Sequence, residues 1–252
     1  MQPEESDTRS RVYYDADAAQ YYDTRFTDPI GARVATRTQQ LIAELLDDLT
    51  IDRAIEVGPG TGRITVEIAA RAAQLMLVDI SPTMLSMSLR PAQTVARGPV
   101  SAVVGSLHRL PCRSASHDLA VCINVLSHVP DAEAAVRELG RVVRPGGRLL
   151  LSSTNLTSAF MPAGLIVNAR QRAFGEDVPA RWHRRRDLIR YLERSGFRID
   201  AIVGGFYLPR AARAVPGLGR LMLWADEREH RRPPGLSRSL APWLLYSCEK
   251  RR

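Results

Sequence analysis

The segment EVGPGTGR at residues 56–63 constrains the fold of this chain more than any other. Its first two residues end a short strand-like run at 53–57, and its last two begin a helical pattern at 62–73. Closely spaced glycines permit a tight turn and allow a ligand to approach the backbone. The turn also leads into a helix N-terminus, where backbone N–H groups attract a carboxylate or a phosphate. We therefore predict a strand, a ligand-binding turn and a helix in succession, with a turn that binds no ligand as the alternative.

The chain alternates between short apolar runs, typical of buried strands, and helical patterns. One helix is expected to begin with Ser81 as N-cap and Pro82 at the first helical position, and another is expected after Asp131. This alternation is typical of βαβ units, which form a parallel sheet with right-handed crossovers. The expected strands are 53–57, 75–79, 100–104, 118–123, 148–153, 197–203 and 243–248, and the expected helices include 62–73, 81–90 and 187–195.

Composition narrows the class of protein. The chain has 252 residues, of which 45% are hydrophobic and 25% charged, a balance typical of a globular domain. Its three cysteines form no CxxC pair, which excludes a disulfide framework and a zinc ribbon. No apolar run reaches the roughly 20 residues of a membrane-spanning helix, and residues 1–10 do not resemble a signal peptide. We therefore expect a cytoplasmic protein with no membrane span and no metal site.

The net charge of +8 raises the question of a nucleic-acid partner. Lys250 is the only lysine, so the excess is almost entirely arginine, with local clusters at 184–186 and 231–232. Such a bias is typical of a GC-rich genome, and dispersed arginines do not form a track for phosphates. We therefore expect no nucleic-acid partner.

The spacing of the glycines separates the classes of ligand. The dinucleotide-binding pattern is GxGxxG, whereas this chain has GxGxG, with Arg63 at the position of the third glycine of that pattern. Glu56 precedes the turn, where an acid suits a ligand with an ammonium group better than one with a pyrophosphate. Asp79 ends the next apolar run, where an acid accepts hydrogen bonds from ribose hydroxyls. A ribose combined with a cationic amino-acid group is the chemistry of S-adenosylmethionine.

Four segments resemble, in order, the motifs of class I S-adenosylmethionine-dependent methyltransferases. They are EVGPGTG, LVDISPTML, GSLHRLPCRSASHDLAVCINVLSHV and RELGRVVRPGGRLLLSS. The chain is most similar to the small-molecule branch, which includes enzymes of quinone biosynthesis and natural products. The resemblance covers residues 40–155 closely, and the helix at 187–197 and the last strand more loosely.

The resemblance implies a role for each matching position. The backbone of the three glycines would contact the methionine moiety, and Glu56 would hold its ammonium group. Asp79 would accept from the ribose hydroxyls, and Asn124 would lie beside the methyl-bearing sulfur. The family often has an acid where this chain has Ser106. The implied cofactor-binding set is Tyr14, Tyr22, Glu56, Gly58, Gly60, Gly62, Asp79, Ile80, Met84, Ser106, Leu107 and Asn124, with Ile80, Met84, Ser106 and Leu107 around the adenine.

His128, which follows the fourth expected strand, is the candidate catalytic base, because an imidazole accepts a proton near neutral pH. A histidine that only packs beside the cofactor is the alternative. Residues 1–12 are polar and are expected to be irregular, whereas the tyrosines that follow are expected to close over the cofactor as a lid or to form the packed face of a helix.

Together these features predict an α/β fold. It is a doubly wound Rossmann-like sheet of seven strands, with the last strand antiparallel and with helical cap insertions. We divide the chain into an N-terminal lid segment (1–32), a cofactor-binding core (33–155) and the remainder of the core (156–252) with substrate-cap insertions at 156–183 and 207–242.

The predicted activity is methyl transfer from S-adenosylmethionine to an O, N or C atom of a small, apolar or aromatic molecule. An RNA or DNA methyltransferase is one alternative, although the segment NVLS at 124–127 lacks the proline pair of amino-methylating nucleic-acid enzymes. A cofactor-binding protein without catalysis is another. The glycine spacing disfavours a nicotinamide oxidoreductase. The sequence gives no indication of the oligomeric state.

Overall fold

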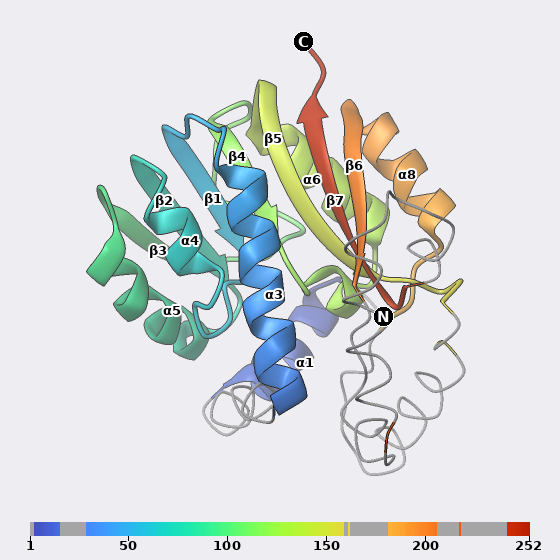
Figure 1. Ribbon diagram of the computed structural model, residues 1–252, viewed down its shortest axis with the longest axis horizontal. Coiled ribbons are helices and arrows are strands. Elements are labelled where there is room, and N and C mark those ends of the chain that lie inside the picture. The colour runs from blue at the N-terminus through green and yellow to red at the C-terminus, as the bar shows by residue number, and fades with distance from the viewer. Residues whose placement is uncertain (1–2, 16–28, 159–160, 162–180, 206–216, 218–240) are drawn as a thin grey trace.

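A computed structural model describes residues 3–15, 29–158, 161, 181–205, 217 and 241–252 (Figure 1). Most of the two expected cap insertions, and Tyr22 of the expected cofactor-binding set, lie outside these residues. Within the described residues, no helix combines the length and the apolar character needed to cross a membrane.

A seven-stranded sheet forms the centre of the molecule, in the order β3-β2-β1-β4-β5-β7-β6 (Figure 1). The first five strands pair in parallel, whereas β7 lies antiparallel between β5 and β6. This arrangement confirms the predicted sheet with an antiparallel last strand. The strands are β1 (Arg53–Val57), β2 (Gln74–Asp79), β3 (Val100–Val104), β4 (His117–Cys122), β5 (Val143–Thr154), β6 (Phe197–Gly205) and β7 (Trp243–Lys250).

Helices cover both faces of the sheet, and another lies at the carboxyl ends of the parallel strands (Figure 1). The first face carries α3 (Pro29–Leu46), α4 (Thr65–Ala69) and α5 (Pro82–Val95). The second face carries α6 (Ala132–Val142) and α8 (Arg185–Arg194). The helix at the carboxyl ends, α1 (Pro3–Tyr14), occupies the stretch expected to be irregular, so that expectation was wrong.

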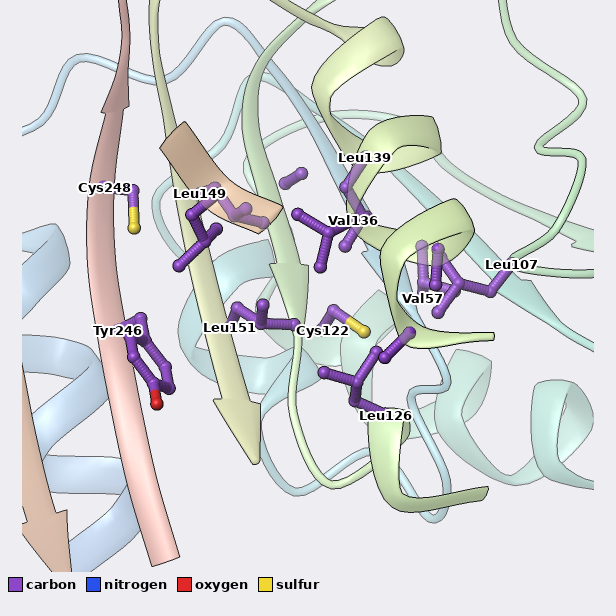
Figure 2. Packing of buried hydrophobic residues seen from close by; sticks show 14 of the residues in the cluster. Val57, Leu107, Cys122, Leu126, Val136, Leu139, Leu149, Leu151, Tyr246 and Cys248 are labelled. Atoms are coloured by element: carbon purple, nitrogen blue, oxygen red, sulfur yellow. The ribbon is translucent and has the colours of Figure 1, made fainter. Parts of the chain in front are cut away.

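A separate apolar core fills each side of the sheet. Figure 2 shows the core beneath α6, where Leu149 and Leu151 of β5 and Cys122 of β4 belong to the same apolar cluster as Val136 and Leu139 of the helix. The central strands are buried on both faces. They therefore appear in the sequence as continuous apolar runs rather than as alternating patterns.

The predicted starts of two helices are confirmed by their caps. The Ser81 hydroxyl accepts a hydrogen bond from the Met84 backbone N–H, and Pro82 occupies the first turn of α5. Asp131 accepts in the same way from the Ala134 N–H at the start of α6, at 2.9 Å. Local sequence therefore determines where these two helices begin.

The bounds of three other elements differ from those expected. The helix expected at 62–73 contains only Thr65–Ala69, because Gly62 has a φ of +89° and the N–H of Ala73 donates to the carbonyl of Ile51, which precedes β1. α5 continues past Pro91 to Val95, since packing of the fully buried Ala92 holds its last turn. β5 begins at Val143 rather than at residue 148, with an irregular register opposite β4 that accommodates its proline and glycines.

Lys250, the only lysine, lies at the carboxyl end of β7 and holds the end of α8. Its Nζ donates to the Ser195 carbonyl and lies 5.1 Å from the centre of the Phe197 ring. A cation at a helix C-terminus is favourable, because the carbonyls there carry partial negative charge. Partial burial lowers the pKa of Lys250.

Candidate active site

A pocket opens at the carboxyl ends of β1, β2 and β4, where the strand order reverses. Ligands of doubly wound sheets bind at such a switch point. Asp7, Ser10 and Tyr14 of α1 form one wall. The pocket contains much of the predicted set, namely Tyr14, Gly58, Gly60, Asp79, Ile80, Met84, Leu107, Asn124 and His128.

Gly58 and Gly60 of the glycine turn line this pocket, whereas Gly62 of the predicted set is not among the lining residues. The geometry of the turn requires glycine at two positions. Gly58 has a φ of +70°, and a Cβ at this position would lie 2.2 Å from Cγ2 of Val125. Gly62 has a φ of +89°, and a Cβ there would lie 2.8 Å from the Ser88 Cα. Any side chain at either position would therefore meet the loop after β4 or the backbone of α5.

Asp79 is the acid that faces the pocket. It ends β2, and its Oδ1 accepts from the Ser81 backbone N–H at 2.9 Å. Burial raises the pKa of Asp79 to about 6, although backbone N–H groups at Ser81 and Gly60 oppose the rise. This carboxylate is thus oriented by backbone donors before any ligand binds.

Glu56 lies beneath the glycine turn, outside the lining of the pocket. It is buried, and its Oε2 has no hydrogen-bond partner among the described residues. Burial raises the pKa of Glu56 to about 8, and the nearby charge of Asp79 adds to the rise. A buried, unpartnered carboxyl oxygen is costly unless a donor or a cation satisfies it. Together with the glycine turn and Asp79, it fits a ligand that carries an ammonium group and a ribose.

Three of the four residues expected around the adenine line the pocket, and Ser106 does not. Ile80, Leu107 and the almost fully buried Met84 supply an apolar wall. Ser106 is not among the lining residues; its Oγ accepts instead from the His108 N–H at 3.1 Å within its own loop. Gly105 lines the pocket beside it.

His128 lies at the opposite side of the pocket, in the short 3₁₀ helix η1 (Leu126–His128) after β4. The Tyr14 hydroxyl lies 3.1 Å from His128 Nε2, and the two rings meet edge to face with centroids 5.6 Å apart. The end of the first expected insertion supports this turn, since the Arg181 N–H donates to the Ser127 carbonyl at 2.8 Å. The structure thus brings the candidate base and one predicted lid tyrosine together.

Asn124 occupies the edge of the pocket in a left-handed conformation, with a φ of +62°. Its backbone N–H donates to Ser152 Oγ at 2.7 Å, and its Oδ1 accepts from Trp243 Nε1 at 2.8 Å. Sequence reasoning missed both Ser152 and Trp243. No local signal marks them, because they come from β5 and β7.

Sequence reasoning also missed Asp15, which follows α1. Its Oδ1 accepts from Ser81 Oγ at 3.0 Å and from Thr83 Oγ1 at 3.3 Å. The carboxyl end of α1 is thereby attached to the amino end of α5.

A glycine turn after β1, an acid ending β2 and a pocket at the switch point define a class I S-adenosylmethionine-dependent methyltransferase. The chain belongs to this family, in its small-molecule branch, and its cofactor is S-adenosylmethionine. The profile of a family described as "Methyltransferase domain" matches residues 55–151.

The chain is 29% identical to a ubiquinone biosynthesis O-methyltransferase of Xanthomonas oryzae pv. oryzae (strain PXO99A) over 210 residues, or 80% of this chain and 82% of that one. Among solved structures, it is similar to magnesium protoporphyrin IX methyltransferase from Synechocystis PCC 6803, which contains bound S-adenosylhomocysteine. The TM-score is 0.65 and the identity 19%, over 96% of this chain and 99% of that one. It is also similar to the N-methyltransferase NodS from Bradyrhizobium japonicum WM9, with a TM-score of 0.60 and 15% identity, over 98% and 99% of the two chains. These two likenesses show the fold.

Proposed function

We propose that this methyltransferase acts on a hydroxyl group of a small, apolar or aromatic molecule, with His128 as the general base. The observation that carries the proposal is the 3.1 Å contact between the Tyr14 hydroxyl and His128 Nε2, at the edge of the pocket that Asp79 and Gly58 line. The name of the Xanthomonas oryzae relative, an O-methyltransferase of quinone biosynthesis, supports the choice of acceptor.

In this proposal the β1–β2 side of the pocket holds the cofactor. The backbone at Gly58 and Gly60 binds the methionine moiety, and Asp79 accepts from the ribose hydroxyls. Glu56 stabilises the ammonium group from beneath the turn. Bound S-adenosylmethionine supplies an electrophilic methyl group on a positively charged sulfur. The apolar Met84 and Leu107 pack against the adenine and exclude water.

The β4 side of the pocket handles the acceptor. A hydroxyl group is a weak nucleophile until it loses its proton, so its methylation benefits from a base within reach. In the tautomer with a proton on Nδ1, His128 accepts from the Tyr14 hydroxyl at Nε2. Tyr14 thereby orients the imidazole, and it can relay the proton of the acceptor to Nε2.

The proposal also covers the location of the protein and the class of its substrate. We infer that the protein acts in the cytoplasm, supported by three cysteines that are all free thiols. We also infer that it has no nucleic-acid substrate, since its arginines are dispersed along the chain. Binding to generic RNA or duplex DNA should then vanish at about 150 mM salt in a gel-shift series.

The test combines binding with turnover. Titration calorimetry should give tight binding of S-adenosylhomocysteine and none of NAD. Incubation with methyl-labelled S-adenosylmethionine and a panel of catechols and quinols should give labelled ethers by mass spectrometry. Binding of S-adenosylhomocysteine without methylation of any panel member would overturn the proposed activity and favour a cofactor-binding protein without catalysis.

A further inference from the structure

The orientation of the Asn124 side-chain amide is fixed by chemistry. An indole Nε1–H can only donate, so the Asn124 atom that lies 2.8 Å from Trp243 Nε1 must be the carbonyl oxygen, Oδ1. The usual ambiguity between the oxygen and the nitrogen of an amide does not arise here. The amide nitrogen, Nδ2, therefore occupies the opposite side of the group.

Three strands hold this orientation. Asn124 follows β4, Ser152 lies on β5 and Trp243 begins β7. Ser152 Oγ accepts from the Asn124 backbone N–H at 2.7 Å and lies 3.5 Å from Oδ1. Ser152 and Trp243 are both buried, so neither is free to turn away. The bonds to these two side chains occupy Oδ1.

The amide nitrogen Nδ2 faces the pocket, whereas Oδ1 faces the buried side chains. Asn124 is an exposed residue that lines the pocket, and within the described part of the chain Nδ2 has no hydrogen-bond acceptor. The amide thus offers N–H donors to the pocket, while its acceptor is already engaged. The left-handed backbone at this position, with a φ of +62°, is one that asparagine adopts more readily than most residues.

We propose that Asn124 selects an oxygen nucleophile and that Trp243 is the positioning residue that makes it do so. This inference rests on the proposed function and deepens it. An oxygen nucleophile has at least two lone pairs, so one can accept from Asn124 while another attacks the methyl group. A neutral amine has a single lone pair, and a hydrogen bond from Asn124 would block the attack. The N–H groups of an amine would also need an acceptor, and Asn124 Oδ1 cannot serve because it already accepts from Trp243.

The chemical step balances for an oxygen acceptor. The hydroxyl proton passes to His128, directly or through Tyr14. A lone pair of the oxygen forms the new bond to the methyl carbon, and the methyl–sulfur bond breaks with its electron pair left on sulfur. The N–H group of Asn124 stabilises the negative charge that develops on the oxygen before the bond forms.

Asn124→Asp is the sharpest test, because it keeps the shape of the side chain and replaces the N–H donor with a carboxylate oxygen. Aspartate has the shape of asparagine, tolerates the left-handed backbone and still accepts from Trp243, but it presents a carboxylate oxygen to the pocket. We expect the ratio of kcat/KM for a phenol over the aniline of the same skeleton to fall by about 10- to 100-fold. The affinity for S-adenosylhomocysteine is measured in parallel, and the ratio is taken at saturating S-adenosylmethionine so that a change in cofactor binding does not enter it.

A second readout does not depend on turnover. In the complex with S-adenosylhomocysteine, the absorbance of bound 4-nitrophenol reports whether it is ionised. The wild-type protein should lower the pKa of the bound phenol, and Asn124→Asp should raise it by at least about one unit relative to the wild type. Unequal ionisation of a bound probe is not expected from a role in folding alone.

Trp243→Phe tests the positioning role. It removes the indole donor, so the amide becomes free to turn, and the phenol-over-aniline ratio should fall without a matching fall in cofactor affinity. Trp182→Phe is the matched control, since Trp182 lines a separate groove beside α8 and its Nε1 has no partner among the described residues. This control should keep the ratio of the wild type.

The outcomes separate the two proposals. Failure of the proposed function appears as no methylation of any panel member by the wild type. Methylation that proceeds with an unchanged phenol-over-aniline ratio and an unchanged 4-nitrophenol spectrum in Asn124→Asp overturns this inference alone. A wild-type preference for the aniline does the same.

Discussion

The two sides of the pocket are built in different ways. On the β1–β2 side, Asp79 is oriented by the N–H of Ser81, two residues further along the chain, and the backbone of the glycine turn lines the pocket. On the β4 side, His128 meets Tyr14 across 114 residues and Asn124 meets Trp243 across 119 residues. Short-range backbone contacts thus prepare the side proposed for the cofactor, whereas long-range side-chain contacts prepare the side proposed for the acceptor.

The segment at the end of α1 connects the two sides. Tyr14 contacts His128 on the acceptor side, and the next residue, Asp15, bonds Ser81 and Thr83 on the cofactor side. Apart from this segment, each side depends on its own contacts. A change that affects only one side should leave the other intact, provided that it does not release α1.

The largest effect is expected on the acceptor side. His128→Gln should lower kcat by about 10²- to 10⁴-fold, because the acceptor loses its base. Cofactor affinity should stay within about threefold, since the cofactor side does not use this side chain. Methylation kinetics and calorimetry with S-adenosylhomocysteine measure the two quantities. An equal loss of both would show that the two sides are not separable.

The next largest effect is expected on the free energy of unfolding, through the protonation of Glu56. The pKa of Glu56 is about 8 in the folded protein and near 4.5 in the unfolded chain, so between these values the folded state binds the extra proton. The free energy of unfolding of the cofactor-free protein should therefore fall as the pH rises from about 5 to 8, at up to about 1.4 kcal/mol per pH unit. Glu56→Gln should flatten this slope.

Thermal midpoints over this pH range check the expectation. Asp79→Asn is the matched control, because the pKa of Asp79 is about 6 and its contribution has the same sign but ends at a lower pH. That variant should keep the slope between pH 6.5 and 8. The opposite result would be a thermal midpoint that rises with pH in the wild type and in Asp79→Asn but stays level in Glu56→Gln. It would mean that folding favours ionised Glu56, and it would contradict the assignment of a protonated side chain.

A smaller effect is expected for the ribose contact. Asp79→Ala should weaken S-adenosylhomocysteine binding at least about tenfold, since a hydrogen bond to a charged group contributes about 1.5–3 kcal/mol. Asp79→Asn should be milder, because one acceptor remains. Near-native affinity in a folded Asp79→Ala protein would exclude this acid as the ribose ligand.

The smallest effect is expected where the two sides join. Asp15→Asn weakens the bonds that α1 makes with the start of α5, and the carboxylate is partly exposed. Net hydrogen bonds of this kind contribute about 0.5–1 kcal/mol, so cofactor affinity should fall about two- to fivefold. Limited proteolysis within α1 should speed up in parallel.

The contrast between the two sides also explains what the sequence could predict. The glycine turn and Asp79 are contiguous with strands β1 and β2, so the position of each side chain follows from a local pattern. The parallel strands β1, β2, β4 and β5 could be predicted equally well, since buried strands appear as apolar runs. Their irregular ends, such as the start of β5, were not, because a register shift depends on the neighbouring strand.

The partners of Asn124 and His128 could not be found in this way. Nothing in the segments around Trp243 and Tyr14 indicates that each meets a residue more than one hundred positions away. The helix α1 was missed for the same reason: PEESDTRSRVYY is mostly polar, and contacts of its last residues with the rest of the molecule stabilise it. Tertiary contacts override local propensity at such places.

The single lysine offers a means of measuring motion. Because Lys250 is the only lysine in the chain and its partly buried Nζ donates to the Ser195 carbonyl, an amine-directed reagent should react faster with the ε-amine of Lys250 whenever this contact opens. The labelling rate at this residue, followed by mass spectrometry, therefore reports the opening frequency of the β6–β7 edge, a local unfolding equilibrium that global denaturation does not resolve.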